Sequence, residues 1–106
     1  MTQSNAIKQA RPERSKAAKQ KLPLELGAVV RTPGVMNLPL DPLILALMEH
    51  QSGNWGDVCS EDWTSNDLAL EHGDRILSSY SINGTKMWII TEWDRSVTTL
   101  LLPEEY

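Results

Sequence analysis

The sequence has one cysteine, no phenylalanine and no long apolar run among its 106 residues. Its longest uninterrupted apolar stretch is residues 43–48, whereas a membrane-spanning helix needs roughly 20 such residues. The single thiol of Cys59 cannot form an internal disulfide, which fits a reducing compartment. The first residues carry charge without an apolar stretch behind them, so we expect no secretory signal. These absences predict a cytoplasmic protein with no membrane anchor and a single small domain.

Sequence signatures of catalysis are also missing. There is no Gly-rich phosphate loop, no Walker motif and no recognisable Ser-His-Asp signature. The side chains that could bind a metal lack an established ligand spacing such as His-x-x-x-His or Cys-x-x-Cys; they are His50, Asp57, Cys59, Asp62, His72 and Asp74. Both histidines stand near a predicted helix end, where the helix dipole favours a protonated imidazole as a cap. We therefore expect no metal, no cofactor and a protein that is not an enzyme.

Charge divides the chain in two. Residues 1–21 carry six basic side chains and one acidic one, a net charge of +5, with few large apolar residues. Such a segment cannot bury enough apolar surface to offset the entropy of ordering, so we expect a disordered basic tail. The remaining residues, 22–106, are predicted to form the folded domain. Their net charge of −9 opposes a nucleic-acid-binding surface on that domain.

The basic tail allows two interpretations. It is either a solubilising segment or an arm that contacts nucleic-acid phosphates and releases their counterions. No aromatic side chain is interleaved with its cations, so base stacking is not expected. The cations that would make phosphate contacts are Lys8, Arg11, Arg14, Lys16, Lys19 and Lys21.

Turn and cap signals in the first part of the domain predict a short strand and then a helix. Residues 26–32 are β-branched in their second half and stop at a Pro-Gly turn, as a short strand does. Asp41 is a suitable N-cap for a helix that has Pro42 at its first position, and Gly53 can end it. Residues 43–48 are apolar on every side, so this helix is predicted to be buried.

A second helix between Ser60 and Gly73 leads into a predicted antiparallel meander. Asn83-Gly84 is the preferred type I′ hairpin turn between two β-rich runs, and residues 97–102 return as a third strand. The predicted register pairs Ile82 with Thr85, Tyr80 with Met87, Ser78 with Ile89, Ile76 with Thr91, Arg75 with Glu92 and Ile89 with Leu100. The predicted class is α+β: a short N-terminal strand, two helices, then a three-stranded antiparallel meander.

Apolar side chains occupy both faces of this meander. Two helices can cover one face only, so the second face needs another cover or remains an exposed apolar patch. We considered two covers: a two-fold homodimer that packs the second faces together, and residues 22–32 folded across the face. The apolar side chains of the second face are Leu77, Trp88, Ile90, Val97 and Leu101.

Two loops carry the residues best suited to bind a partner. The first loop holds Trp55 and Asp57, and an exposed loop tryptophan would mark a binding surface. The alternative is that Trp55 fills the core between helices and sheet. The second loop gathers two carboxylates, an indole and a guanidinium, which are those of Glu92, Trp93, Asp94 and Arg95. It could recognise an anion or perform acid–base chemistry, or it could be a solvated turn with a local Arg–Asp pair.

The run WIITEWDRSVTTLLLPEEY at residues 88–106 resembles the ending of a family of small uncharacterised bacterial proteins carried by plasmids and other mobile elements. The resemblance extends more weakly back to residues 33–35, and the basic tail lies outside it. It implies no established activity. What it implies is an accessory role on a mobile element.

These observations together predict a non-enzymatic accessory or regulatory protein of a bacterial mobile element that acts through protein contacts. Two alternatives stay open. One is a nucleic-acid-associated regulator that uses the basic tail. The other is a small hydrolase with a site formed by the 92–96 turn and the loop of Trp55 and Asp57.

Overall fold

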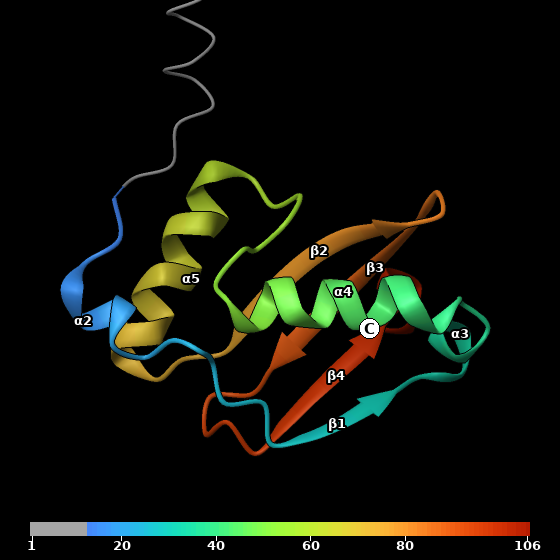
Figure 1. Cartoon of the computed structure of the whole chain (residues 1–106), viewed down its shortest axis with the longest axis horizontal. Helices are drawn as coiled ribbons and strands as arrows, with labels where there is room; N and C mark the ends of the chain where they lie inside the picture. Colours follow the sequence, from blue (N-terminus) through green and yellow to red (C-terminus); the bar gives the residue numbers. More distant parts are fainter. Residues whose placement is uncertain (1–12) are drawn as a thin grey trace, which may run out of the picture.

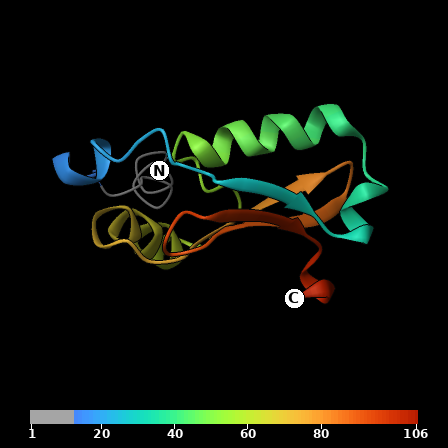
Figure 2. The same cartoon turned by 90° about the horizontal axis from the view of Figure 1, so that it is seen from below.

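The computed structural model describes residues 13–106 and folds them as an α+β domain (Figure 1). Its elements in chain order are α2 (Lys16–Lys19), β1 (Ala28–Arg31), α3 (Pro33–Met36), α4 (Leu40–Gln51), α5 (Ser60–His72), β2 (Ile76–Ile82), β3 (Thr85–Thr91), β4 (Val97–Leu101) and η1 (Pro103–Glu105). Within the described residues the strands form one mixed sheet in the order β1-β4-β3-β2. Figure 2 shows α4 on one side of this sheet and the C-terminal turn on the other. The α+β class is therefore confirmed, and the sheet is one strand wider than the predicted meander.

The predicted hairpin and its register are confirmed. Strands β2 and β3 pair antiparallel with Ile82 opposite Thr85, and β3 pairs with β4 so that Ile89 lies opposite Leu100. Asn83 and Gly84 have φ angles of 51° and 86°, as both central residues of a type I′ turn require. The guanidinium of Arg75 also donates to Glu92 at 3.1 Å, which is the charge pair that the register predicted.

Strand β1 departs from the sequence-based prediction in length and in place. It spans four residues and pairs parallel with β4, with Ala28 opposite Val97. Gly27 sets its start, because a Cβ there would lie 2.2 Å from the backbone oxygen of Ser96 and φ is +63°. The alternative in which residues 22–32 fold across the second face is therefore wrong. The strand extends the sheet sideways instead.

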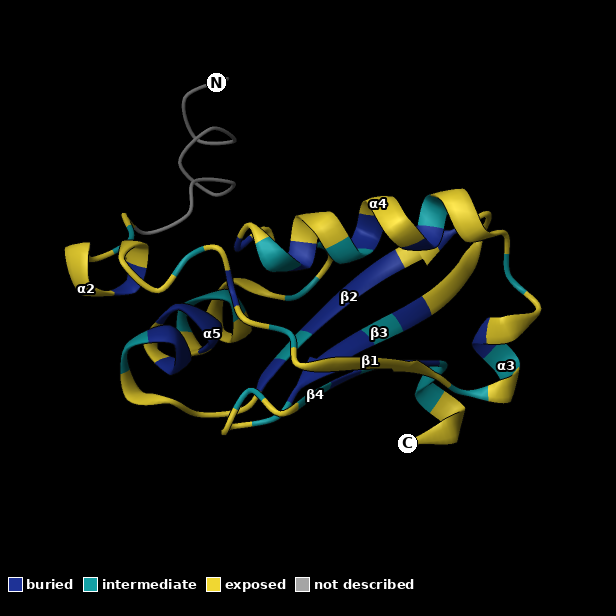
Figure 3. Cartoon of the chain, turned by 60° about the horizontal axis from the view of Figure 1, so that its bottom comes forward, coloured by how far each residue is buried: buried dark blue, intermediate teal, exposed yellow. Residues whose placement is uncertain are grey.

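Helix α4 is buried on one side only, so the prediction of a helix buried all round is wrong. Its sheet-facing side chains form a core with β2, β3 and β4, whereas Leu40, Ile44, Leu45 and Met48 are exposed (Figure 3). A helix that covers a single sheet has one neighbour, so its far side stays in water. The helix also begins one residue before Asp41, with Pro39 at the N-cap position. Helix α5, in contrast, starts and stops where it was predicted.

Residues 13–21 belong to the folded domain, which corrects their assignment to a disordered tail. Ser15 caps α2, and Ala18 is fully buried in a second core formed mainly with α5 and Trp55. Arg14 makes a 3.0 Å ion pair with Asp67 of α5. A short segment with few apolar residues is thus held chiefly by the buried Ala18, the Ser15 cap and the partly buried pair of Arg14 and Asp67. Residues 1–12 lie outside the described part of the chain.

The second face of the sheet is partly covered by the chain itself. Ile90 and Leu101 are 3% and 5% exposed. Beside them the ring of Trp88 meets that of Tyr106 edge-on at 5.9 Å, and Arg75 donates to the Tyr106 hydroxyl at 2.8 Å. This cover reduces the apolar surface that a second-face homodimer would bury, and that dimer remains a prediction. Across residues 13–106, no helix is long and apolar enough to cross a membrane.

Candidate functional site

The two predicted binding loops lie in different settings. Trp55 is fully buried, and its Nε1–H donates to the Asp67 carboxylate at 2.9 Å. The backbone N–H of Asp57 donates to Ser79 of β2 at 2.7 Å, so this loop lies along the β2 edge. The structure thus supports the core-packing interpretation of Trp55.

The second loop is held in place chiefly by Arg95. This residue has a φ of 60°, and its guanidinium donates to the backbone oxygens of Asp74, Glu92 and Ala69 at 2.6, 3.1 and 3.0 Å. Burial lowers the pKa of Arg95. Because the Ala69 carbonyl lies in the last turn of α5, this guanidinium caps the helix and ties the turn to it. The predicted recognition group therefore has a structural task.

The acidic side chains of this loop have local partners. The carboxylate of Asp94 accepts from the Ser96 hydroxyl at 2.6 Å and from its backbone N–H at 3.1 Å, which lowers the pKa of Asp94. Glu92 is paired with Arg75. The local pair of Asp94 is with serine and not with arginine. The side chain of Trp93 points into solvent, with 66% of its surface exposed.

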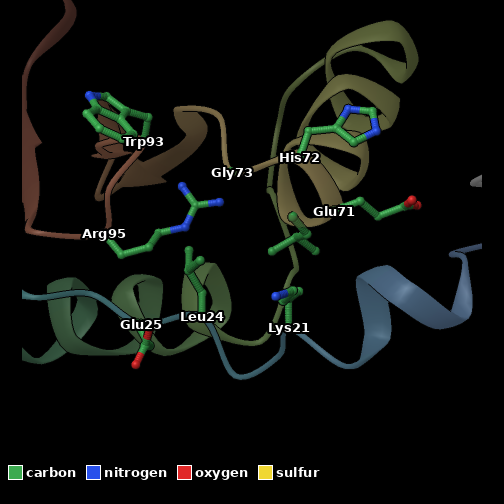
Figure 4. Close-up of a pocket in the computed structure, with 9 residues that line it drawn as sticks. Lys21, Leu24, Glu25, Glu71, His72, Gly73, Trp93 and Arg95 are labelled. Carbon is green, nitrogen blue, oxygen red and sulfur yellow. The ribbon is translucent and has the colours of Figure 1, made fainter.

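Trp93 and Arg95 line a cavity of about 280 Å³ near the end of α5 (Figure 4). Arg95 reaches into it, whereas Glu25, Glu71 and His72 point away from its centre. The Trp55–Asp57 loop is not part of its lining. This cavity therefore does not join the two loops, as a site of the hydrolase alternative could have done.

A buried polar chain links α4 to the sheet, and sequence analysis did not foresee it. His50 is fully buried between Ser78 and Thr91, with Nδ1 2.5 Å from the serine hydroxyl and Nε2 2.8 Å from the threonine hydroxyl. Thr91 lies 2.7 Å from the Thr98 hydroxyl, which donates to the Leu26 carbonyl at 2.8 Å. Since that carbonyl only accepts, the Thr98 hydroxyl donates to it, Thr91 donates to Thr98, and Thr91 accepts from a hydrogen on Nε2 of His50.

The expectation of a protonated, helix-capping His50 is therefore wrong. Burial, with a smaller contribution from the positive charge of Arg95, lowers the pKa of His50 from 6.5 to about 3. Desolvation outweighs the favourable end of the helix dipole at this position. Among residues 13–106, no group of three or more potential ligands could hold a metal ion.

The two edges of the sheet differ sharply. On the β2 edge, the side-chain amide of Asn66 bonds both the N–H and the C=O of Leu77. Further along, Ser79 exchanges backbone hydrogen bonds with Trp55 and Asp57. The β1 edge carries no such cover from the described residues. An open edge of this kind can pair with another chain.

A groove runs between the open β1 edge and α4. Its volume is about 240 Å³, and its lining is Val29, Arg31, Leu40, Leu43, Ile44, Leu47 and Leu100. The outward side of α4 continues this apolar surface, because residues four apart share one helix side. That row consists of Leu40, Ile44 and Met48, which are 57%, 45% and 58% exposed. We call the β1 edge together with this row the edge groove.

The edge groove was missed by sequence analysis, although two signals for it were present. The apolar residues of α4 extend around more of the helix surface than one sheet can cover. In addition, the strand at residues 28–31 had no predicted partner strand. Taken together, these signals indicate an unpaired strand edge beside exposed apolar surface on a helix.

The cations proposed for nucleic-acid contact are divided by the structure. Lys8 and Arg11 lie outside the described residues. Arg14 is engaged by Asp67 and by the carbonyl of Gly53. Lys16, Lys19 and Lys21 are exposed along and just after α2.

Comparisons of the chain with protein-family models, with curated proteins and with the solved structures give no match.

Proposed function

We propose that this chain is a protein-binding domain that acts by accepting an extended polypeptide segment on the edge groove. The observation that carries the proposal is the contrast between its sheet edges. The β2 edge is capped by Asn66, Trp55 and Asp57, whereas the β1 edge has no cover from residues 13–106 and lies beside an apolar helix row. Strand addition to an open edge gives affinity through backbone hydrogen bonds, and adjacent apolar pockets give specificity. An accessory or regulatory role on a mobile element would be exercised through this contact.

The backbone of β1 has the alternation that strand addition needs. Ala28 N–H donates to Ser96, and Thr32 N–H donates to Leu100, so even-numbered residues turn toward β4. In a parallel pair the intervening residues face the other way. Val29 and Arg31 therefore direct their N–H and C=O groups outward, where an incoming segment can reach them.

The apolar row on α4 supplies the second half of the contact. Val29 and Arg31 pair with Thr98 and Leu100, so their side chains lie on the α4 face of the sheet. A segment added to β1 would place every second side chain against this row. Such burial is favourable because it removes apolar surface of both partners from water.

A proline substitution on the open edge tests the proposal. Val29→Pro removes an outward N–H that has no partner among residues 13–106, and edge strands tolerate proline at such positions. A photo-reactive side chain replacing Ile44 is expected to form a covalent adduct with the partner in the native host. We expect Val29→Pro to reduce that adduct about tenfold, the loss that corresponds to roughly 1.4 kcal/mol of binding.

Val29→Thr is the matched control, since it keeps a β-branched side chain and the N–H. It should preserve the adduct, and the melting temperatures of both variants should stay close to that of the parent protein. A photo-reactive side chain at Lys86, exposed on the hairpin away from the groove, should give no adduct that responds to Val29→Pro. The absence of an adduct at position 44, or an adduct that Val29→Pro leaves unchanged, would contradict the proposal.

A further inference from the structure

The open edge of β1 is flanked on both sides by residues that cannot extend it. Gly27 has a φ of +63°, and Pro33 opens α3. The strand therefore offers two outward residues, Val29 and Arg31, and up to four backbone hydrogen bonds to an antiparallel neighbour. A short edge of this kind selects its neighbour by register as well as by chemistry.

We propose that the occupant of the edge groove is a second copy of this chain, paired antiparallel through β1 about a two-fold axis. This inference rests on the proposed function and names its partner. The two copies would form one continuous eight-stranded sheet, with both α4 helices on the same face. The contact is isologous, because the same strand is used by both copies.

The closed β2 edge favours this symmetric pairing over a head-to-tail one. Joining β1 of one copy to β2 of another would require the bonds of Asn66 to Leu77 and of Ser79 to Trp55 and Asp57 to break. Head-to-tail pairing would also leave one open edge at each end and propagate into a filament. Pairing β1 with β1 uses the open edge of both copies and closes the assembly.

Charge and backbone conformation select one register. Outward residues must face outward residues, which allows Val29 opposite Arg31, Val29 opposite Val29, or Arg31 opposite Arg31. The last register sets like charges against each other, which is unfavourable. The register with Val29 opposite Val29 sets Arg31 opposite Gly27, whose positive φ is not that of a strand. The register with Val29 opposite Arg31 keeps all the paired residues within extended backbone and separates the two guanidinium groups.

The area that a stable contact needs points to a folded partner and not to a short peptide. A specific interface buries roughly 800 Å² on each side, more than a four-residue edge supplies alone. A second copy brings its own row of Leu40, Ile44 and Met48 to the same face of the sheet. On the opposite face, Val30, 45% exposed, would meet its symmetry mate. Each copy therefore covers apolar surface with apolar surface.

The register makes a sharp prediction for disulfide trapping. Val30 would sit on the two-fold axis opposite its own mate in a non-hydrogen-bonded pair, whose Cα atoms lie about 4.5 Å apart. That spacing accepts a disulfide. The two copies of Val29 would instead be diagonal neighbours about 7–8 Å apart, beyond easy bridging. In a Cys59→Ser background, which removes the exposed native thiol, Val30→Cys should cross-link rapidly under mild oxidation and Val29→Cys should not.

Sedimentation of the same cysteine variants, before oxidation, measures their oligomeric state. High salt is used because it screens repulsion between the acidic domains. We expect a dimer that Val29→Pro shifts about tenfold toward monomer, while Trp88→Glu, on the second face, leaves Val30→Cys cross-linking unchanged. A monomer with no cross-link at position 30, a cross-link at position 29 instead, or loss of the position-30 cross-link in Trp88→Glu would overturn the inference.

The failures of the two proposals can be told apart. A position-44 adduct with a different protein, sensitive to Val29→Pro, would uphold the protein-binding function and overturn the self-pairing. An adduct with a second copy of this chain would support both. No adduct at position 44 would contradict the binding function itself.

Discussion

Replacing Trp55 with alanine is expected to lower the free energy of unfolding by about 3–5 kcal/mol, the usual cost of deleting a large buried aromatic ring. The indole is fully buried, and it lies edge-on to His50 at 5.6 Å and 5.8 Å from the guanidinium carbon of Arg14. Its N–H also donates a hydrogen bond to the Asp67 carboxylate. The substitution removes contacts to Arg14 and to helices α4 and α5 at once, so the second core should loosen as a unit.

Trp93→Ala is the matched control, because it makes the same chemical change on a side chain that is 66% exposed. A surface change of this kind should stay within about 0.5 kcal/mol. Urea denaturation followed by far-UV circular dichroism measures both variants without relying on tryptophan emission. Equal effects of the two substitutions would contradict the placement of Trp55 in the core.

Acidification is expected to destabilise the domain through His50 well before most carboxylates are protonated. The pKa of His50 is about 3 in the folded state against 6.5 for the free side chain. Because the folded pKa is the lower one, the unfolded chain takes up the proton first as the pH falls. The stability that the neutral imidazole provides is complete above pH 6.5 and is lost progressively toward pH 3. By pH 4.5, about two units below the free value, the proton taken up by His50 in the unfolded chain alone should lower the free energy of unfolding by about 3 kcal/mol.

A second histidine provides the control for this pH dependence. His50→Gln should fold less stably but show a much flatter stability curve between pH 6.5 and 4.5, whereas His72→Gln, at an exposed position, should keep the parent slope. The His50 ring resonances should also remain those of a neutral imidazole at pH 5 in the intact protein. A parent-like slope in His50→Gln, or a His50 ring that titrates near 6.5, would contradict the buried polar chain.

Local signals explain which parts of the fold could be predicted. The Asn83-Gly84 turn and the alternation on either side of it set the hairpin register without help from distant residues. Likewise, Gly73 ends α5 with a φ of 75°, a conformation that glycine adopts without strain.

The unpredicted parts depend on contacts that are remote in sequence. Strand β1 pairs with β4, almost 70 residues later, because Gly27 permits a close approach to Ser96. Nothing in the segment around Gly27 specifies that partner. Helix α4 has apolar residues on every side, so its sequence could not indicate which side would face the sheet.

The candidate site was missed for the same reason. Trp55 and the 92–96 turn have conspicuous side chains, but their hydrogen-bonding groups are used to hold the fold together. The edge groove is made of ordinary valine, leucine and isoleucine residues. The apolar excess on α4 and the strand without a predicted partner were indirect signals for it, but which sheet edge stays open is visible only once the pairing of every strand is known.

Amide hydrogen exchange in the assembled protein shows most directly whether β1 pairs with another chain. Val30 directs its N–H toward β4 and should be protected with or without a partner. Val29 and Arg31 direct theirs outward, so the account predicts that they become protected only when the groove is occupied. Their protection should rise with protein concentration and disappear at high dilution. Fast exchange of Val29 and Arg31 under conditions in which a dimer or complex is present would show that the contact lies elsewhere and would contradict pairing through the β1 edge.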